Sequence, residues 1–318
     1  MDRPSLIDIR GALKRIESFI HCTPVLTCST LNNMCGAELF FKCENLQKGG
    51  AFKIRGAANA VFSLDEKEIA RGVVTHSSGN HAAALALAAR WREVRAYVVM
   101  PDNASTVKKN AVADYGAEII PCEPTLEARE EMLAKVQEGT GAYFIHPYND
   151  YQVIAGQGTA ALELCREIPG LDVVVAPVGG GGLLSGTALA VSEASPGTLV
   201  VGAEPEMADD AYRSLKAGRL IPVQNPQTVA DGLRTSLGNL TFPIIRDHVQ
   251  EIITVTEKAI VEAMRLMWER MKIVVEPSGA APLAALLPKS EKFLGKRVGI
   301  IVSGGNVDLD RLPWGDGF

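Results

Sequence analysis

A chain of 318 residues, of which 47% are hydrophobic and 22% charged, is long and apolar enough to bury a large core. The formal net charge of −5 and the lack of any lysine or arginine run argue against nucleic acid or an anionic membrane as a partner. The N-terminal region lacks the apolar core of a signal peptide, and no stretch is long enough to span a bilayer. We therefore expect a cytoplasmic protein that acts on small molecules.

The six cysteines contain no CxxC pair and no cluster with histidine at metal-ligand spacing. We expect reduced and mostly buried thiols, as in a cytosolic protein. A redox-sensitive pair stays an alternative, because four of the six lie close together near the N-terminus, namely Cys22, Cys28, Cys35 and Cys43.

The first predicted element is an amphipathic helix with one apolar face, formed by Leu6, Ile9, Leu13, Ile16 and Ile20. From residue 70 onward, four β-branched runs alternate with helical patterns: GVVTHS, RAYVVM, AEIIPC and AYFIHP. A second series contains the strand patterns DVVVAPV, TLVVGAEP and KRVGIIVSGG and the helical patterns LLSGTALAVSEA and KAIVEAMRLMWERM. Strands that alternate with helices at this spacing predict parallel α/β units.

The two series predict an open α/β architecture of two twisted sheets with flanking helices, which face each other across a cleft. We expect a small domain at residues 70–149, inserted into a large domain made of residues 1–69 and 150–318. No flexible linker or internal repeat marks these boundaries.

Three of the predicted strands end in loops of small polar residues and glycine, at residues 75–80, 178–182 and 303–306. In open parallel sheets, ligands bind at the carboxyl ends of the strands. The three loops are therefore candidates for a single binding site.

The loop Gly179, Gly180, Gly181 and Gly182 leads directly into a predicted helix, so its backbone N–H groups can bind a phosphate. The run fits neither GxGxxG nor GK[ST], which argues against a dinucleotide and against a P-loop nucleotide. A tight strand-to-helix turn is the alternative. Four consecutive glycines cost backbone entropy, which favours anion binding.

The second loop places hydroxyl and amide groups at the start of a predicted helix at residues 82–90, where they suit a carboxylate or cap the helix. These residues are Ser77, Ser78, Asn80 and His81. In the third loop, Ser303 can offer a hydroxyl to a ligand or cap a turn. None of the five histidines forms a recognisable triad or metal pair.

Lys53 lies in the stretch KGGAFKIRG, which by itself predicts only a turn into a helix with ordinary first-turn charges. A lysine combined with a phosphate-binding loop suggests pyridoxal phosphate (PLP), which forms a Schiff base with an amine. The chain resembles the serine racemase and serine/threonine dehydratase family, which has the fold type II of PLP enzymes shared with the tryptophan synthase β subunit. Eight stretches carry the resemblance: TPVL (23–26), FFKCENLQKGGAFKIRGA (40–57), THSSGNHAAAL (75–85), IAGQGTAALEL (154–164), PVGGGGLLSG (177–186), EPEMADD (204–210), VEPSGA (275–280) and IVSGGNVDL (301–309).

The resemblance implies how PLP would be held. Lys53 would form the Schiff base, Phe52 and Gly232 would lie against the ring, and the glycines at 179–182 would bind the phosphate. Asn80 would reach the ring hydroxyl, and Ser303 would bond the pyridine nitrogen.

The resemblance also implies the substrate contacts and the two bases. The substrate carboxylate would be held by Ser77, Ser78, Asn80 and His81. Lys53 would move the α-proton on one face of the substrate and Ser78 on the other. Arg129 would approach a second carboxylate in the closed form, or it is an ordinary charge on a helix surface.

A divalent cation, Mg²⁺ or Ca²⁺, is implied at the stretch EPEMADD. The carboxylates of Glu204 and Asp210 and the carbonyl of Ala208 would bind it, since such hard ions prefer oxygen ligands. Without the resemblance, two acids six positions apart are typical of a solvated surface.

The implied activity is racemisation of serine, accompanied by β-elimination to pyruvate and ammonia, in a homodimer. A serine at the pyridine nitrogen leaves the ring largely unprotonated, so both activities are expected together. The alternatives are dehydration of serine, threonine or threo-3-hydroxyaspartate, racemisation of aspartate, and a non-catalytic protein that binds PLP or an amino acid. Nucleotide activation is not expected, because Ala82–Ala84 stand where animal relatives carry a glutamine that helps bind ATP.

Overall fold

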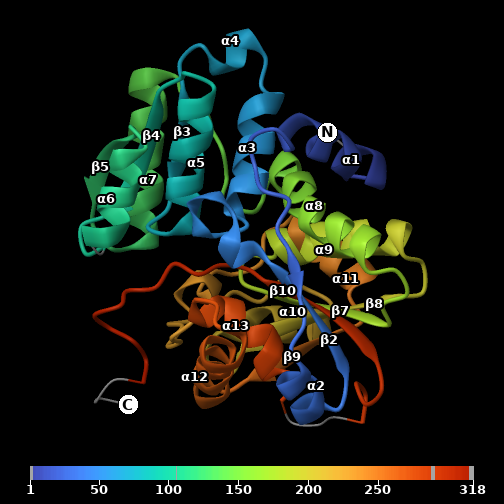
Figure 1. Cartoon of the computed structure of the whole chain (residues 1–318). Helices are drawn as coiled ribbons and strands as arrows, with labels where there is room; N and C mark the ends of the chain where they lie inside the picture. Colours follow the sequence, from blue (N-terminus) through green and yellow to red (C-terminus); the bar gives the residue numbers. More distant parts are fainter. Residues whose placement is uncertain (1–2, 105, 288–290, 315–318) are drawn as a thin grey trace.

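The strands form two separate sheets, as the computed structural model of residues 3–104, 106–287 and 291–314 shows (Figure 1). One sheet has six strands in the order β1-β2-β10-β7-β8-β9, and the other has four in the order β5-β4-β3-β6. The prediction of two sheets with flanking helices is confirmed.

The six-stranded sheet is parallel except for β1, which runs antiparallel to β2. Its central strands are buried along nearly their whole length, as expected for a parallel sheet covered on both faces. The strands are β1 (Val25–Leu26), β2 (Glu38–Cys43), β7 (Val173–Pro177), β8 (Leu199–Pro205), β9 (Glu251–Val255) and β10 (Arg297–Val302). The sequence analysis had identified β7, β8 and β10 but not β1, β2 or β9.

The four-stranded sheet consists of β3 (Val73–His76), β4 (Ala96–Pro101), β5 (Glu118–Cys122) and β6 (Tyr143–Phe144), all parallel. Val74 pairs with Phe144, and the N–H of Ile145 donates to the carbonyl of Val74 at 2.9 Å. Continuing this register brings His76 beside His146, whose ring centroids lie 6.0 Å apart.

Helices cover both faces of the six-stranded sheet, and neighbouring residues of β10 show this directly. Ile301 packs in a cluster with α1, α8, α9 and α11, whereas Ile300 packs in a second cluster with α2, α12 and α13. The helices are α1 (Leu6–Ile16), α2 (Ser29–Cys35), α3 (Lys53–Ser63), α4 (Glu66–Ile69), α5 (Asn80–Trp91), α6 (Thr106–Asp114), α7 (Leu126–Thr140), α8 (Tyr151–Glu167), α9 (Gly182–Ala194), α10 (Asp210–Ala217), α11 (Thr241–His248), α12 (Glu257–Leu266) and α13 (Pro277–Ala284). In the described part of the chain, no helix combines the length and apolarity needed to cross a membrane.

The predicted helix at residues 258–271 differs from the structure at its end. The α-helix α12 stops at Leu266, and the chain continues as a π-helical turn from Met267 to Met271. Within this turn the indole N–H of Trp268 donates to the carbonyl of Val275 at 2.9 Å. The turn ends where Lys272 adopts a left-handed conformation, with φ of 60°.

The four-stranded sheet is formed by one continuous stretch of chain, whereas the six-stranded sheet takes strands from both sides of that stretch. α3 packs against both α5 and α8 and so lies between the two sheets (Figure 1). This arrangement agrees with an inserted unit, and the boundaries at 69/70 and 149/150 stay predictions.

The six cysteines form no disulfide bond within the described residues. Cys35, Cys43 and Cys122 are buried, Cys28 and Cys165 are half-buried, and Cys22 is exposed.

Candidate active site

The predicted loops leave their sheets next to the lysine. β10 and β7 are parallel neighbours, so Ser303 and the glycine loop follow the same edge of the six-stranded sheet. The segment before α3 pairs with the loop after β10, through the bonds Phe52 N–H to Ser303 O and Gly305 N–H to Gly50 O, both 2.9 Å. Lys53 therefore begins α3 beside the Ser303 loop.

Lys53 is half-buried, and its amine donates to the carbonyl of Pro147 at 2.9 Å. Burial lowers the pKa of Lys53 to about 8, although the attraction of the Glu276 carboxylate raises it. The amine lies 5.2 Å from the centre of the Phe52 ring. An amine with a pKa near 8 is much closer to its nucleophilic neutral form at physiological pH than an ordinary lysine.

Asn306 joins three of the predicted segments. Its side-chain amide N–H donates to the carbonyl of Gly49 at 2.8 Å and to the side-chain oxygen of Asn80 at 3.0 Å. Gly50 has φ of +72°, and a Cβ at this position would lie 2.3 Å from the Asn306 side-chain oxygen. Only glycine allows the segment before Lys53 to approach so closely.

Glu276 is a buried acid that the sequence analysis did not assign. Both of its oxygens accept from the side-chain N–H of Asn80, at 2.9 and 3.1 Å, and its side chain is only 4% exposed. Burial raises the pKa of Glu276 to about 7. The sequence feature that could have indicated this residue is an acid inside an apolar run, directly before the proline that begins α13. Glu276 thus fixes the orientation of the Asn80 amide.

The loop after β3 holds the three other residues expected at the substrate carboxylate. The hydroxyl of Ser77 accepts from the N–H of Gly79 at 3.3 Å. The hydroxyl of Ser78 makes no hydrogen bond within the described residues. His81 is 2% exposed, and neither ring nitrogen has a partner in the described part of the chain. Burial, followed by the charge of Lys53, lowers the pKa of His81 well below its usual value.

The glycine loop lies tightly against other segments. A Cβ at Gly180 would be 2.4 Å from the ring of Tyr148, and a Cβ at Gly179 would be 2.9 Å from the backbone of Leu233. The same position of Gly179 lies 3.1 Å from the carbonyl of Gly232, so Gly232 lies beside the glycine loop, and its contact with the cofactor ring stays a prediction. Gly181 has φ of +89° and gives α9 no side-chain cap. The first N–H groups of α9 therefore have no capping side chain and suit an anion.

Arg129 lies near the site without bonding to the residues described so far. Its side chain donates to the carbonyl of Thr125, at the start of its own helix, at 3.2 Å. Burial, helped by the charge of Arg129, lowers the pKa of His76 to about 4. Arg129 thus faces the His76 side of the four-stranded sheet.

Glu204 and Asp210 are buried next to each other at the end of β8 and the start of α10. The oxygens of Glu204 accept from the N–H groups of Ala211 and Tyr212, both at 2.8 Å. One oxygen of Asp210 accepts from the N–H of Leu237 at 3.0 Å, whereas the other is buried without a partner among the described residues. Burial raises the pKa of Glu204 to about 9 and that of Asp210 to about 7.

No group of three or more histidine, cysteine, aspartate or glutamate side chains that could hold a metal occurs in the described ranges. A cation at Glu204 and Asp210 would need the carbonyl of Ala208, in the 3-10 turn between them, as a further ligand. The unpaired oxygen of Asp210 fits such an ion, because a positive charge would compensate a buried carboxylate.

The sequence pattern of the family described as "Pyridoxal-phosphate dependent enzyme" matches residues 16–304. The chain belongs to this family. It is thus a PLP-dependent enzyme, and the resemblance found in the sequence is confirmed.

Several relatives of this PLP enzyme match it over nearly their whole length. It is 55% identical to a beta-hydroxyaspartate dehydratase of Paracoccus denitrificans, over 98% of this chain and 99% of the relative. It is 54% identical to a serine racemase of Dictyostelium discoideum, over 97% of this chain and 96% of the relative. The structure of maize serine racemase has a TM-score of 0.95 and 47% identity, covering 97% of this chain and 95% of that one.

The residues of this PLP enzyme fit the cofactor. A phosphate suits the uncapped start of α9, where the contacts of Gly180 leave no room for a side chain. Bound PLP withdraws electrons from the Cα atom of an amino acid and so acidifies its α-hydrogen. Lys53 would carry the cofactor, and Asn80, held by Glu276, would reach its ring hydroxyl. These assignments are proposals that rest on the contacts above.

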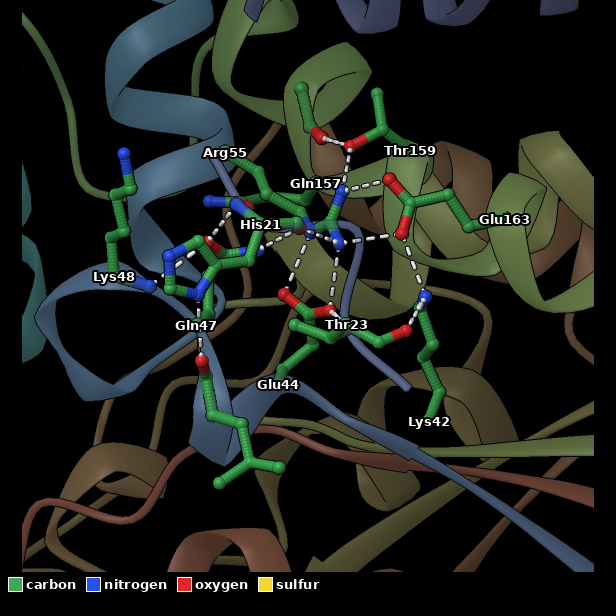
Figure 2. A network of polar contacts seen from close by, with 12 residues as sticks. His21, Thr23, Lys42, Glu44, Gln47, Lys48, Arg55, Gln157, Thr159 and Glu163 are labelled. Atoms are coloured by element: carbon green, nitrogen blue, oxygen red, sulfur yellow. Dashed lines mark hydrogen bonds and ion pairs between the residues drawn. The ribbon is translucent and has the colours of Figure 1, made fainter. Parts of the chain in front are cut away.

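A buried ion network surrounds Arg55, which follows Lys53 by two residues in α3 of the PLP enzyme (Figure 2). Arg55 is fully buried and bonds both oxygens of Glu44, at 2.7 and 2.8 Å, and both oxygens of Glu163, at 2.7 and 2.8 Å. The amine of Lys42 lies 2.7 Å from Glu163 and donates to the carbonyl of Thr23 at 2.6 Å. Two positive and two negative charges thus join β2, the turn after it, α3 and α8.

Proposed function

We propose that this PLP enzyme interconverts L- and D-serine and also converts serine to pyruvate and ammonia. The observation that carries the proposal is the amine of Lys53, with its pKa near 8, beside the loops of Ser303 and Asn80. The 54% identity to a serine racemase over 97% of the chain supports serine as the substrate.

Each residue has a role in this proposal. The Lys53 amine removes the α-proton on one face, and the Ser78 hydroxyl, which has no partner within the described residues, returns a proton on the other. Ser77, Asn80 and His81 bind the substrate carboxylate at the start of α5. In elimination, Lys53 takes the α-proton while the bond from the β-carbon to the hydroxyl breaks, and the Lys53 ammonium returns this proton to the hydroxyl, which leaves as water. A water molecule then hydrolyses the released enamine to pyruvate and ammonia.

The experiment is chiral analysis of the products from L-serine, run beside a pyruvate assay. D-serine together with pyruvate supports the proposal, whereas pyruvate without D-serine makes the protein a dehydratase. Lys53→Ala should lose turnover and the absorbance of the lysine-linked cofactor. Ser78→Ala should lose racemisation but retain some elimination, and undiminished racemisation would contradict the two-base scheme.

A second candidate is dehydration of 3-hydroxyaspartate. It is favoured by the 55% identity to a beta-hydroxyaspartate dehydratase and by Arg129, whose charge reaches His76 beside the Ser77 loop. Assays with 3-hydroxyaspartate, threonine and aspartate separate these substrates from serine. If Arg129 binds a second carboxylate, Arg129→Ala should weaken turnover of 3-hydroxyaspartate and leave that of serine nearly unchanged.

The proposal includes a Mg²⁺ or Ca²⁺ site formed by Glu204, Asp210 and the carbonyl of Ala208. The support is the buried, unpaired oxygen of Asp210. We also propose a homodimer in the cytoplasm, which size measurement in solution and localisation of the tagged protein would test.

A further inference from the structure

His146 has one ring nitrogen fixed as an acceptor. It follows β6, and its Nδ1 atom accepts the backbone N–H groups of Asn149 at 2.9 Å and Tyr148 at 3.3 Å. A nitrogen that accepts two N–H groups cannot carry a proton itself. The neutral imidazole must therefore carry its proton on Nε2, on the opposite side of the ring.

The surroundings of His146 keep the ring neutral. The groups that face it are His76 from β3, Lys53 from α3 and His81 from α5, together with the Tyr148 ring at 4.6 Å. Burial, and then the charges of His76 and Lys53, lower the pKa of His146 to about 4. Protonation at Nδ1 would also break both hydrogen bonds of the turn, so the ring stays a neutral N–H donor at physiological pH.

The loop that carries His146 is tied down at its far end. The side-chain oxygen of Asn149 accepts the N–H of Leu240 at 2.9 Å, and its amide donates to Asn239 at 2.7 Å. A Cβ at Gly238 would lie 2.1 Å from the Asn149 oxygen, which shows how closely the two segments pack. The donor on His146 is thus held in a fixed position.

The Nε2–H group of His146 has no hydrogen-bond partner within the described residues, and the charge of Lys53 is felt at the His146 ring. The Lys53 amine bonds the carbonyl of Pro147, the residue directly after His146. No hydrogen bond from Nε2 occurs within the described residues, and Nε2 is not among the fully enclosed unpaired atoms. His146 is half-buried, so its Nε2–H group is not fully enclosed by the described residues and is left for a ligand to accept from.

We propose that His146 Nε2–H is the hydrogen-bond donor that recognises the hydroxyl on the β-carbon of the substrate. The inference rests on the proposed function, which places a β-hydroxy amino acid next to Lys53. A neutral N–H donor suits a neutral hydroxyl oxygen, and it discriminates against substrates that lack this oxygen. His146 keeps its proton and acts by binding alone.

His146→Asn separates this role from a purely structural one. The oxygen of an asparagine accepts N–H groups two and three residues further on, so it can preserve the turn. Its short side chain leaves no donor at the position of Nε2. His248→Asn, at the end of α11, is the matched control because His248 contacts none of the residues of the site. Thermal unfolding of both variants measures any general loss of structure.

The first measurement is nitrogen NMR of the holoenzyme labelled in its histidines, with the His146→Asn variant used for assignment. We expect His146 to be protonated at Nε2 only, without titration between pH 6 and 9. A proton on Nδ1, or a titration midpoint above pH 6, would overturn the inference whatever the substrate is.

The second measurement compares ligands with and without the hydroxyl, by the change they cause in the absorbance of the bound cofactor. In His146→Asn, the affinity for L-serine should fall roughly three- to tenfold, the range of one neutral hydrogen bond, while the affinity for L-alanine stays unchanged. Equal losses for both ligands overturn the inference and indicate a structural role.

A second pair of ligands, 3-hydroxyaspartate and aspartate, separates failure of this inference from failure of the proposed function. If the unchanged enzyme binds 3-hydroxyaspartate but not serine, the serine assignment falls, and a selective loss of 3-hydroxyaspartate binding in His146→Asn still supports hydroxyl recognition. If the unchanged enzyme binds neither hydroxy amino acid, both proposals fall.

Discussion

Replacing Arg55 with methionine removes the guanidinium that joins the two buried carboxylates of Glu44 and Glu163. Four hydrogen bonds of 2.7 to 2.8 Å disappear, two to Glu44 and two to Glu163. Glu163 keeps its ion pair with Lys42, whereas the Glu44 carboxylate keeps, among the described residues, only its hydrogen bond from the Thr23 hydroxyl. One carboxylate is therefore left buried without a compensating charge.

Removing one partner of a buried ion pair costs about 3 to 5 kcal/mol. The unfolding entropy is about 2 cal/mol/K per residue, or roughly 0.7 kcal/mol/K for a chain of 318 residues. A loss of about 4 kcal/mol then corresponds to a fall of about 6 °C in the melting temperature.

The assay is thermal and urea unfolding of the holoenzyme, with Arg265→Met as the matched control. Arg265 forms an exposed ion pair with Glu269, at 2.8 Å, and such surface pairs contribute less than about 0.5 kcal/mol. Adding Glu44→Gln to Arg55→Met should recover part of the loss, because it removes the uncompensated charge. The reasoning is refuted if Arg55→Met costs no more than Arg265→Met, or if the second change lowers stability further.

Three further predictions concern the site. Glu276→Gln should lower the pKa of Lys53 below about 8, because the Glu276 carboxylate favours the ammonium form of the lysine. The pH midpoint for reaction of the cofactor-free protein with an amine reagent should then fall, and an unchanged midpoint contradicts the interaction between Glu276 and Lys53. Mg²⁺ at a hundredfold excess over its Kd should stabilise the unchanged protein by about 2.7 kcal/mol but not Asp210→Asn, and equal stabilisation argues against a cation there. Gly180→Ala should lower the affinity for PLP about tenfold, because its Cβ would lie 2.4 Å from the Tyr148 ring. The control Gly139→Ala, whose Cβ would have no atom within 4 Å, should leave the affinity unchanged, and equal affinities of the two variants contradict phosphate binding at the glycine loop.

The elements predicted correctly from the sequence are those with strong local signals. Continuous β-branched runs identify β7 and β8 as strands buried on both faces, and four glycines followed by a helical pattern identify the turn that leads into α9. β2 was missed because its charged Lys42 argues against a buried strand. Only the fold shows that Lys42 meets Glu163, which lies far away in the sequence.

In the candidate site, too, residues in distinctive local stretches were predicted, whereas partners from distant segments were not. Lys53 and the residues at 77–81 were predicted because they belong to recognisable stretches of sequence. The partners that orient them were not, since the contact between Glu276 and Asn80 joins segments 196 residues apart. The turn that fixes the proton of His146 is local, but a histidine accepting from the two following amides has no distinctive pattern in sequence.

The last strand of the chain, β10, occupies the middle of the six-stranded sheet, between β2 and β7. During synthesis, therefore, β2 and β7 both leave the ribosome with an open edge that only the C-terminal strand can fill. The strands of the four-stranded sheet, by contrast, are complete once residue 144 has emerged. Ser303 directly follows β10 and accepts a hydrogen bond from the segment before Lys53, so the cofactor site is assembled last. A chain that ends before β10 should therefore neither complete the six-stranded sheet nor retain PLP.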